Sequence, residues 1–471
     1  MKSIKILLFI LVLAANTTFA QTQFSLDDAV KYAMQHSLGI RNSQLGISDA
    51  DAQIKERRAT GLPQVGATLD WQSFFQKPKV VFPASFSNGT LLAVYGILAQ
   101  EGVKDKSGAV ITGPPAPDPN APEPTPTKVS FVQTHSITPG LSVSQLVYSG
   151  SYNVALRAAT YYRDLVDKQL LSKKAEVRNQ VMDAYLPTLL INESVKTFDK
   201  NIANLEKLLG ETKAFNKEGF VESLDIDRLT LSLENIRTER ENLVRQKEVV
   251  LNALKFVMGM PINENLDVKD DLNGLLKEAS KEDLEGAIQF EKRPEYNVVG
   301  AGEKLQNLNI TLTKASTLPT VAAFGSYSYG FQGNSFKKDD YFFLPTGVVG
   351  AKVSVPIWGG GGLKYTLQRA NLASEITKNQ KIDLERAITL QVANARVMYK
   401  SANIRVASQK KNLALAERIF NTSKIKYKEG IGSSVEMIQA ETALYQTQQN
   451  LMQAQYDLLK SKTDLDKALG N

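Results

Sequence analysis

The sequence has no cysteine and only two histidines, His36 and His135. Without cysteine no disulfide can form, so the chain must fold without covalent cross-links. The same scarcity leaves no cluster of His, Cys and carboxylate residues with metal-ligand spacing. We therefore expect no metal site and no other cofactor.

Motifs of the common enzymes are missing as well. There is no G-x-S-x-G, and two histidines give a Ser-His nucleophile pair almost nothing to build on. The four glycines at 359–362 lack the Gly-Lys-Ser/Thr ending of a phosphate-binding loop, and a flexible joint between a strand and a helix explains them better. We therefore expect no enzymatic activity.

Charge and hydropathy exclude two further classes of protein. The chain has 56 Lys+Arg and 49 Asp+Glu, and the two signs are interspersed, which is typical of solvated helix faces. Nucleic acid is therefore not an expected partner. Beyond the N-terminus no stretch is apolar for the roughly 18 residues that predict a transmembrane helix.

Residues 1–20 have the three parts of a secretory signal peptide. Lys2 and Lys5 precede an apolar run at 6–15, and Thr18-Phe19-Ala20 forms a small-residue cleavage site. The alternative is a membrane anchor, but the apolar run is well short of the ~20 residues that span a bilayer. No cysteine follows for lipid attachment, so we expect cleavage after Ala20 and export.

The two halves of the chain resemble each other. Lys217-Glu218-Gly219-Phe220 recurs as Lys428-Glu429-Gly430-Ile431, 211 positions later, and Leu62-Pro63 recurs as Leu318-Pro319. Such a period predicts two structural repeats. We place the first at 21–260 and the second at 261–471, after a linker at 261–282. Each repeat is expected to run helix, strand, loop, strand, long helix, turn, long helix.

Four runs alternate between apolar and polar residues, at about 63–74, 137–148, 319–331 and 342–358. This pattern fits tilted membrane strands, but it also fits a half-buried sheet in a soluble protein. Four strands cannot close a barrel, and lipid tolerates no open sheet edge, so membrane strands would require several chains. Five aromatic residues lie near the expected strand ends, where a membrane girdle belongs: Trp71, Tyr148, Tyr327, Tyr329 and Trp358.

The connection at 76–135 contains seven prolines between 114 and 126. That proline run can be neither helix nor central strand. We interpret the connection as a long loop on the outer side of a membrane, with an inter-domain linker as the alternative.

Long helical hairpins are expected at 151–258 and 363–470. Their first arms are almost free of glycine for some 66 residues, or ~100 Å of helix, and Pro187 is the one expected kink. Their return arms carry apolar residues every seven positions, which favours coiled coils over an ordinary helical bundle: Leu229, Ile236, Leu243, Val250 and Val257, then Leu444, Leu451, Leu458 and Leu465.

At each hairpin turn a glycine is followed by serine and a carboxylate. We expect Gly219 and Gly430 to end the first arms. We expect the second arms to be capped by a serine, which is Ser223 in the first hairpin and Ser433 or Ser434 in the second.

Over nearly its whole mature length the chain resembles the outer-membrane efflux (TolC-like) family. The resemblance rests on the duplication, the Leu-Pro pairs, Arg293-Pro294-Glu295 and Tyr427-x-x-Gly430, in this order and spacing. It implies a mixed α and β membrane protein built from two internal repeats. Three chains of four strands would form a trimeric 12-stranded outer-membrane β-barrel, continued by a periplasmic α-helical coiled-coil barrel.

The resemblance also implies a function, a location and partners. The chain would be the channel-tunnel of a tripartite efflux or type I secretion system in the bacterial outer membrane, extending into the periplasm. Its partners would be two further copies, outer-membrane lipid, a periplasmic adaptor (membrane fusion protein) and an inner-membrane pump. The alternative is an exported helical-stalk binding or structural protein without pump coupling.

The same resemblance assigns residues to the hairpin tips. Tyr427 matches a tyrosine whose hydrogen bond helps to close the periplasmic aperture, and Glu436 matches the first of its acidic positions. Gln439 stands where a second acid is common, Gly432 where an arginine can lie, and Asp225 where the first repeat usually has an acid. Four tip residues are expected to contact the adaptor: Gly219, Phe220, Gly430 and Ile431.

Overall fold

The structure, a computed structural model, describes residues 22–113, 126–279, 286–335, 337 and 341–470. The expected signal peptide and nearly all of the proline run therefore lie outside the described residues. The described chain divides into two units. One unit holds 58–152 and 317–357, and the other holds 22–57, 153–316 and 358–470.

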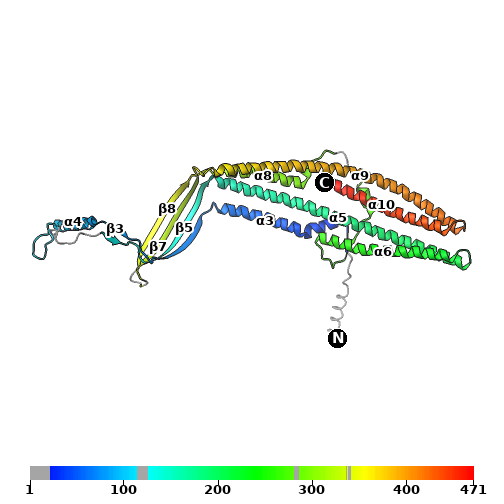
Figure 1. The fold of residues 1–471 in the computed structure, drawn as a ribbon, viewed down its shortest axis with the longest axis horizontal. Helices are drawn as coiled ribbons and strands as arrows, with labels where there is room; N and C mark the ends of the chain where they lie inside the picture. Colours follow the sequence, from blue (N-terminus) through cyan, green and yellow to red (C-terminus); the bar gives the residue numbers. More distant parts are fainter. Residues whose placement is uncertain (1–21, 114–125, 280–285, 336, 338–340, 471) are drawn as a thin grey trace, which may run out of the picture. The chain divides into compact units, whose positions relative to one another are not determined.

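The first unit contains a four-stranded antiparallel sheet in the order β2-β5-β7-β8 (Figure 1). Its strands lie close to the expected runs: β2 (Gln64–Ser73), β5 (His135–Ser149), β7 (Thr320–Gly333) and β8 (Phe342–Ser354). Because β2 and β8 are the edge strands, each leaves one row of backbone groups without a partner strand among the described residues.

The strand register gives this sheet one apolar and one polar face. Val65, Val143, Gly325 and Val349 form one row across the four strands, and Thr68, Gly140, Ser328 and Thr346 form a row on the opposite face. Every residue of β2 is exposed, on both faces. Tyr327, expected near a strand end, lies in the middle of β7, since that strand continues to Gly333. In this last part of β7 the ring of Phe331 packs edge-on against that of Phe343.

The connection between β2 and β5 contains elements that the proline run did not predict. Short strands β3 (Val80–Phe82) and β4 (Thr127–Val129) pair antiparallel. Between them lies helix α4 (Ala84–Gln100), followed by a turn that Lys104 and Val110 close through a single bridge.

The second unit contains two long helical hairpins (Figure 1). The first consists of α5 (Gly150–Lys217) and α6 (Ser223–Met258), and the second of α9 (Gly362–Lys428) and α10 (Ser434–Leu469). Helix α5 continues through Pro187. Among the described residues, no helix combines the length and apolarity that crossing a membrane requires.

Shorter elements accompany the hairpins: β1 (Thr22–Phe24), α2 (Leu26–His36), α3 (Leu38–Ala59), β6 (Leu266–Val268), α7 (Leu272–Ala279), η1 (Phe290–Lys292) and α8 (Pro294–Ala315). The parallel pair β1–β6 and helix α7 fall partly in the stretch that we expected to be a plain linker. They are held to α5 by Tyr185, whose hydroxyl lies 3.0 Å from the Phe24 carbonyl oxygen and 2.9 Å from Asp270 Oδ2.

Heptad residues of both return arms pack inward. Leu229 and Ile236 of α6 join a buried cluster with Leu205 and Leu208 of α5. Met437 of α10 belongs to the same cluster, so the two hairpins share a core near their turns. Since α6 and α10 come from different halves of the chain, this core is where the halves meet at the tip.

Candidate functional site at the hairpin tips

Both hairpins turn by the same backbone motif. Gly219 and Gly430 adopt positive φ angles of 79° and 71°. The amide of Phe220 donates to the carbonyl of Phe215, and the amide of Ile431 donates to that of Lys426, each at 3.0 Å. This bond and the left-handed glycine form a Schellman cap, in which residues with a β-carbon are strained. The expected glycine ends are confirmed in both hairpins.

The residue after each glycine is strongly exposed. Phe220 is 79% exposed and Ile431 is 77% exposed. Two large apolar side chains at helix tips have no core beneath them, which is typical of a surface that a partner covers.

The two return helices begin differently. Ser433 caps α10, since its hydroxyl accepts a hydrogen bond from the Glu436 amide at 3.1 Å. In the first hairpin the expected cap was wrong, because Ser223 is already helical and Glu222 stands at the cap position without a side-chain bond. The amide of Asp225 is satisfied there by the Glu222 carbonyl at 3.1 Å.

A polar cluster joins the two hairpins at their tips, and we call Asp225, Arg228 and Ser434 the tip latch. The Ser434 hydroxyl donates to Asp225 Oδ1, and Arg228 Nη1 lies 3.3 Å from the same oxygen. Arg228 Nη1 also donates to Ser434 Oγ at 3.2 Å. Ser434 is almost fully buried, whereas Asp225 and Arg228 are partly exposed, so the latch is a partly desolvated link between α6 and α10.

Sequence reasoning found only part of this latch. Asp225 was singled out, Ser434 was considered only as a cap, and Arg228 was missed. The spacing of Asp225 and Arg228, three residues apart on one helix face, is the signal that could have paired them. No local signal connects either residue to Ser434.

The tyrosine link expected from the resemblance stays a prediction. The Tyr427 hydroxyl is buried and has no hydrogen bond of ordinary geometry to any described residue, and burial raises the pKa of Tyr427. Beside it, Lys428 Nζ lies 2.5 Å from Glu211 Oε2 and connects α9 to α5. The hydrogen bond from Lys428 holds the pKa of Glu211 below its usual value.

Glu436 and Gln439 lie on the exposed side of α10, away from the buried residues Ser434, Met437 and Ala440. Gly432, where the family can have an arginine, has no room for a side chain. A β-carbon there would lie 2.9 Å from Lys426 Cβ and 3.1 Å from the Tyr427 backbone nitrogen. Of the family's closing residues, this tip therefore presents Glu436 and Gln439 to solvent and cannot present an arginine at 432.

One buried carboxyl near the tip was not predicted. Glu441 of α10 is 1% exposed, and its Oε1 accepts a hydrogen bond from the Tyr445 hydroxyl at 2.6 Å. Its Oε2 is buried without a hydrogen-bond partner among the described residues. Burial raises the pKa of Glu441 to about 6, although the Tyr445 hydrogen bond and nearby Lys424 oppose the change.

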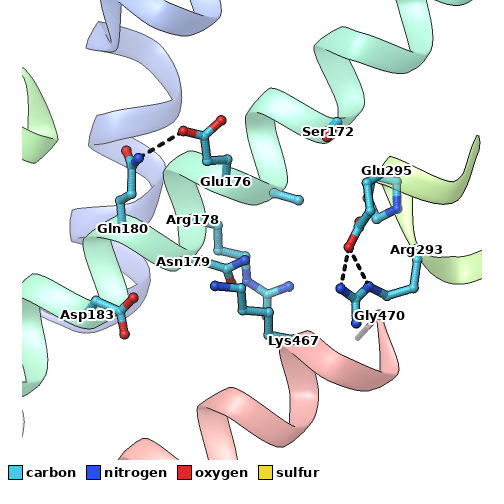
Figure 2. A pocket seen from close by; sticks show the side chains of 12 residues that line it. Ser172, Glu176, Arg178, Asn179, Gln180, Asp183, Arg293, Glu295, Lys467 and Gly470 are labelled. Carbon is cyan, nitrogen blue, oxygen red and sulfur yellow. Dashed lines mark hydrogen bonds and ion pairs between the residues drawn. The ribbon is translucent and has the colours of Figure 1, made fainter. Parts of the chain in front are cut away.

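Farther along the hairpins, a cleft of about 520 Å³ is lined by α5, the start of α8 and the end of α10 (Figure 2). Several of its polar side chains are engaged in hydrogen bonds. Arg293 donates to Glu295 and, at 2.7 Å, to the Ala468 carbonyl, while Gln180 donates to Glu176 at 3.0 Å. The Arg293 bonds lie within the second half of the chain, and the Gln180 bond lies within the first half.

Comparison with known proteins identifies the fold and the family. The outer membrane protein VceC of Vibrio cholerae aligns with a TM-score of 0.65 at 14% identity, over 95% of this chain and 96% of VceC. The family model described as outer membrane efflux protein matches residues 291–471. Residues 291–471 therefore carry an outer membrane efflux protein domain, and the whole chain is similar in fold to TolC-like channels of that family. That family consists of channels and not of enzymes, and the protein is located in the outer membrane and extends into the periplasm.

Two curated relatives are similar over most of their length. Nodulation protein T of Rhizobium leguminosarum bv. trifolii is 22% identical over 315 residues, which are 66% of this chain and 66% of that protein. The probable efflux pump outer membrane protein TtgC of Pseudomonas putida is 21% identical over 71% of this chain and 69% of TtgC. At these identities the roles of individual tip residues do not carry over.

Proposed function

We propose that three copies of this chain form a closed channel through the outer membrane. The observation that carries the proposal is the open sheet, with an apolar and a polar face and free edges at β2 and β8. Lipid cannot satisfy an open edge, so β2 of one copy would pair with β8 of the next. Three sheets of four strands give a 12-stranded barrel, lipid outside and water inside.

The helical hairpins of the three copies would continue this barrel as an α-helical tunnel in the periplasm. Phe220 and Ile431 would be covered by a periplasmic adaptor, which connects the channel to an inner-membrane pump. Glu436 and Gln439, exposed on α10, would line the periplasmic aperture as rings. In this arrangement the protein passes substrates of an efflux or secretion pump to the outside, and the efflux function named for TtgC supports this role.

Cysteine cross-linking tests the assembly directly, because the chain has no cysteine of its own. Leu69→Cys in β2 and Val349→Cys in β8 lie on the apolar face of the two edge strands. A flexible bis-maleimide added to outer membranes should convert the double variant into covalent trimers. Each single variant is the control and should give no trimer.

The opposite outcome is equally clear. Two results together would contradict the trimeric barrel. The double variant would give no intermolecular product, and the purified protein would be a monodisperse monomer, whose mass without bound detergent is below the 51.9 kDa of the full chain with its signal peptide. The exported stalk protein without pump coupling would then be the better interpretation.

A further inference from the structure

The second half of helix α4 is apolar around its whole circumference. The seventeen residues of the helix, Ala84–Gln100, include no charged side chain. In its second half Leu92, Val94 and Ile97 point in different directions, because successive residues are rotated by about 100°. Their exposed fractions are 59%, 46% and 60%. A helix that is apolar on all sides is normally enclosed by protein or by lipid.

The described part of the chain does not enclose α4. None of its residues with a described side chain is buried, and it makes no extensive contact with another described helix or strand. The described residues therefore leave the apolar surface of α4 uncovered, and such a surface is typical of one that a partner or lipid covers.

Exposed lysines surround the ends of this helix. Lys79 precedes it, and Lys104 and Lys106 follow it in the adjoining turn. Two acidic residues lie beside these lysines. Glu101 is the exposed C-cap residue of α4, and Asp105 is engaged locally, since it accepts hydrogen bonds from the Ser107 hydroxyl at 2.6 Å and the Ser107 amide at 2.8 Å. An uncharged apolar segment flanked by lysines is the pattern of a helix that lies at a membrane surface.

We propose that α4 docks on the lipid of the outer membrane, with Leu92–Ala99 against acyl chains and the lysines at anionic headgroups. The eight residues from Leu92 to Ala99 span only about 12 Å, well short of the ~30 Å hydrocarbon core, so the helix enters one leaflet without crossing. The connection leaves the end of the sheet that carries Ser73 and His135, opposite the end joined to α3 and α5.

A second copy of α4 is the competing cover. Helices that pack together in water keep a polar outer face, and the second half of α4 has none. Lipid also accounts for the flanking lysines, because they would repel the same lysines of another copy but attract lipid phosphates.

Fluorescence in reconstituted vesicles tests this docking. Leu92→Cys and Ile97→Cys variants of the full chain carry an environment-sensitive label in vesicles of phosphatidylcholine and phosphatidylglycerol. We expect blue-shifted emission and several-fold stronger quenching by nitroxide-labelled lipids than for Glu417→Cys, an exposed site on α9. Replacing Lys79, Lys104 and Lys106 by Glu should reduce that quenching.

Each other result overturns the proposal. Blue-shifted emission without lipid quenching would indicate a protein contact, as in a second copy, and water-like emission would indicate no cover at all. The proposal rests on membrane insertion of the neighbouring sheet, so a labelled Leu69→Cys serves as reference. Quenching at Leu69 without quenching in α4 refutes only the docking, whereas no quenching at either site refutes the barrel itself.

Discussion

Replacing Glu441 with glutamine should change how stability depends on pH. Glu441 is buried in α10, with one oxygen bonded to the Tyr445 hydroxyl and the other without a partner. Burial penalises its charged form most, so its pKa rises from 4.5 to about 6. Glutamine has nearly the same shape and can still accept the Tyr445 hydrogen bond, but it never ionises.

The size of the effect follows from the two pKa values. Below about pH 4.5 the carboxyl is protonated in both the folded and unfolded states, and its ionisation contributes nothing. As the pH rises from 4.5 through 6, the unfolded state loses its proton first, so the free energy of unfolding falls. The 1.5 difference in pKa corresponds to a loss of about 2 kcal/mol, complete somewhat above pH 6.

Urea unfolding of the full chain in detergent, followed by far-ultraviolet circular dichroism, measures this loss for the helices. Between acidic and mildly alkaline pH, the free energy of unfolding of Glu441→Gln should rise by about 2 kcal/mol relative to that of the unmodified protein. Glu417→Gln, which changes an exposed carboxylate on α9, should show no such gain. A stability difference between Glu441→Gln and the unmodified protein that is equal at both pH values would refute the reasoning.

Three further predictions concern the tips. Ser434→Ala should break the tip latch and lower the free energy of unfolding by about 1–3 kcal/mol, because Asp225 loses its buried hydroxyl partner. The same change should raise the conductance of the channel in planar bilayers, whereas the control Ser433→Ala removes only a cap. An unchanged conductance with Ser434→Ala would contradict a role in closure. Replacing Phe220 and Ile431 together by Asp should abolish export and adaptor cross-linking while the trimer still forms, and normal efflux in that variant would remove the idea of adaptor contact. Glu436→Gln should weaken cation selectivity and block by multivalent cations if the three carboxylates form a ring, whereas an unaltered reversal potential with a small loss of thermal stability would indicate a helix-terminal carboxylate stabilised by the dipole.

Local patterns predicted the elements that depend on local physics. Val65, Ala67, Leu69 and Trp71 alternate with period two, and that period alone assigns them to one face of β2. Gly219 and Gly430 end their helices because a left-handed turn favours glycine. The uncharged apolar run of α4 is a local signal of the same kind, and it lies next to the prolines that favour a loop.

The tip latch and the buried carboxyl could not be predicted in this way. Asp225 and Ser434 are 209 residues apart, and only the packing of α6 against α10 brings them together. Glu441 lies on the buried side of α10 at a position where a charged residue usually indicates an exposed face. Both features depend on which helix faces meet, and the periodicity of one helix does not determine that.

The parallel pairing of β1 with β6 has a consequence for the order of folding. Residues 22–24 are among the first of the described chain, yet their partners are residues 266–268, more than two hundred positions later. Asp270 accepts hydrogen bonds from the Leu26 amide at 2.7 Å and from the Tyr185 hydroxyl at 2.9 Å. It too comes after the whole first hairpin in the sequence. Contacts of such high sequence separation form late, because the chain between them must first be ordered. During export β1 therefore lacks its partner strand until the chain past Asp270 has emerged, and in that interval we expect the apolar seam of the first hairpin to be accessible to chaperones and proteases.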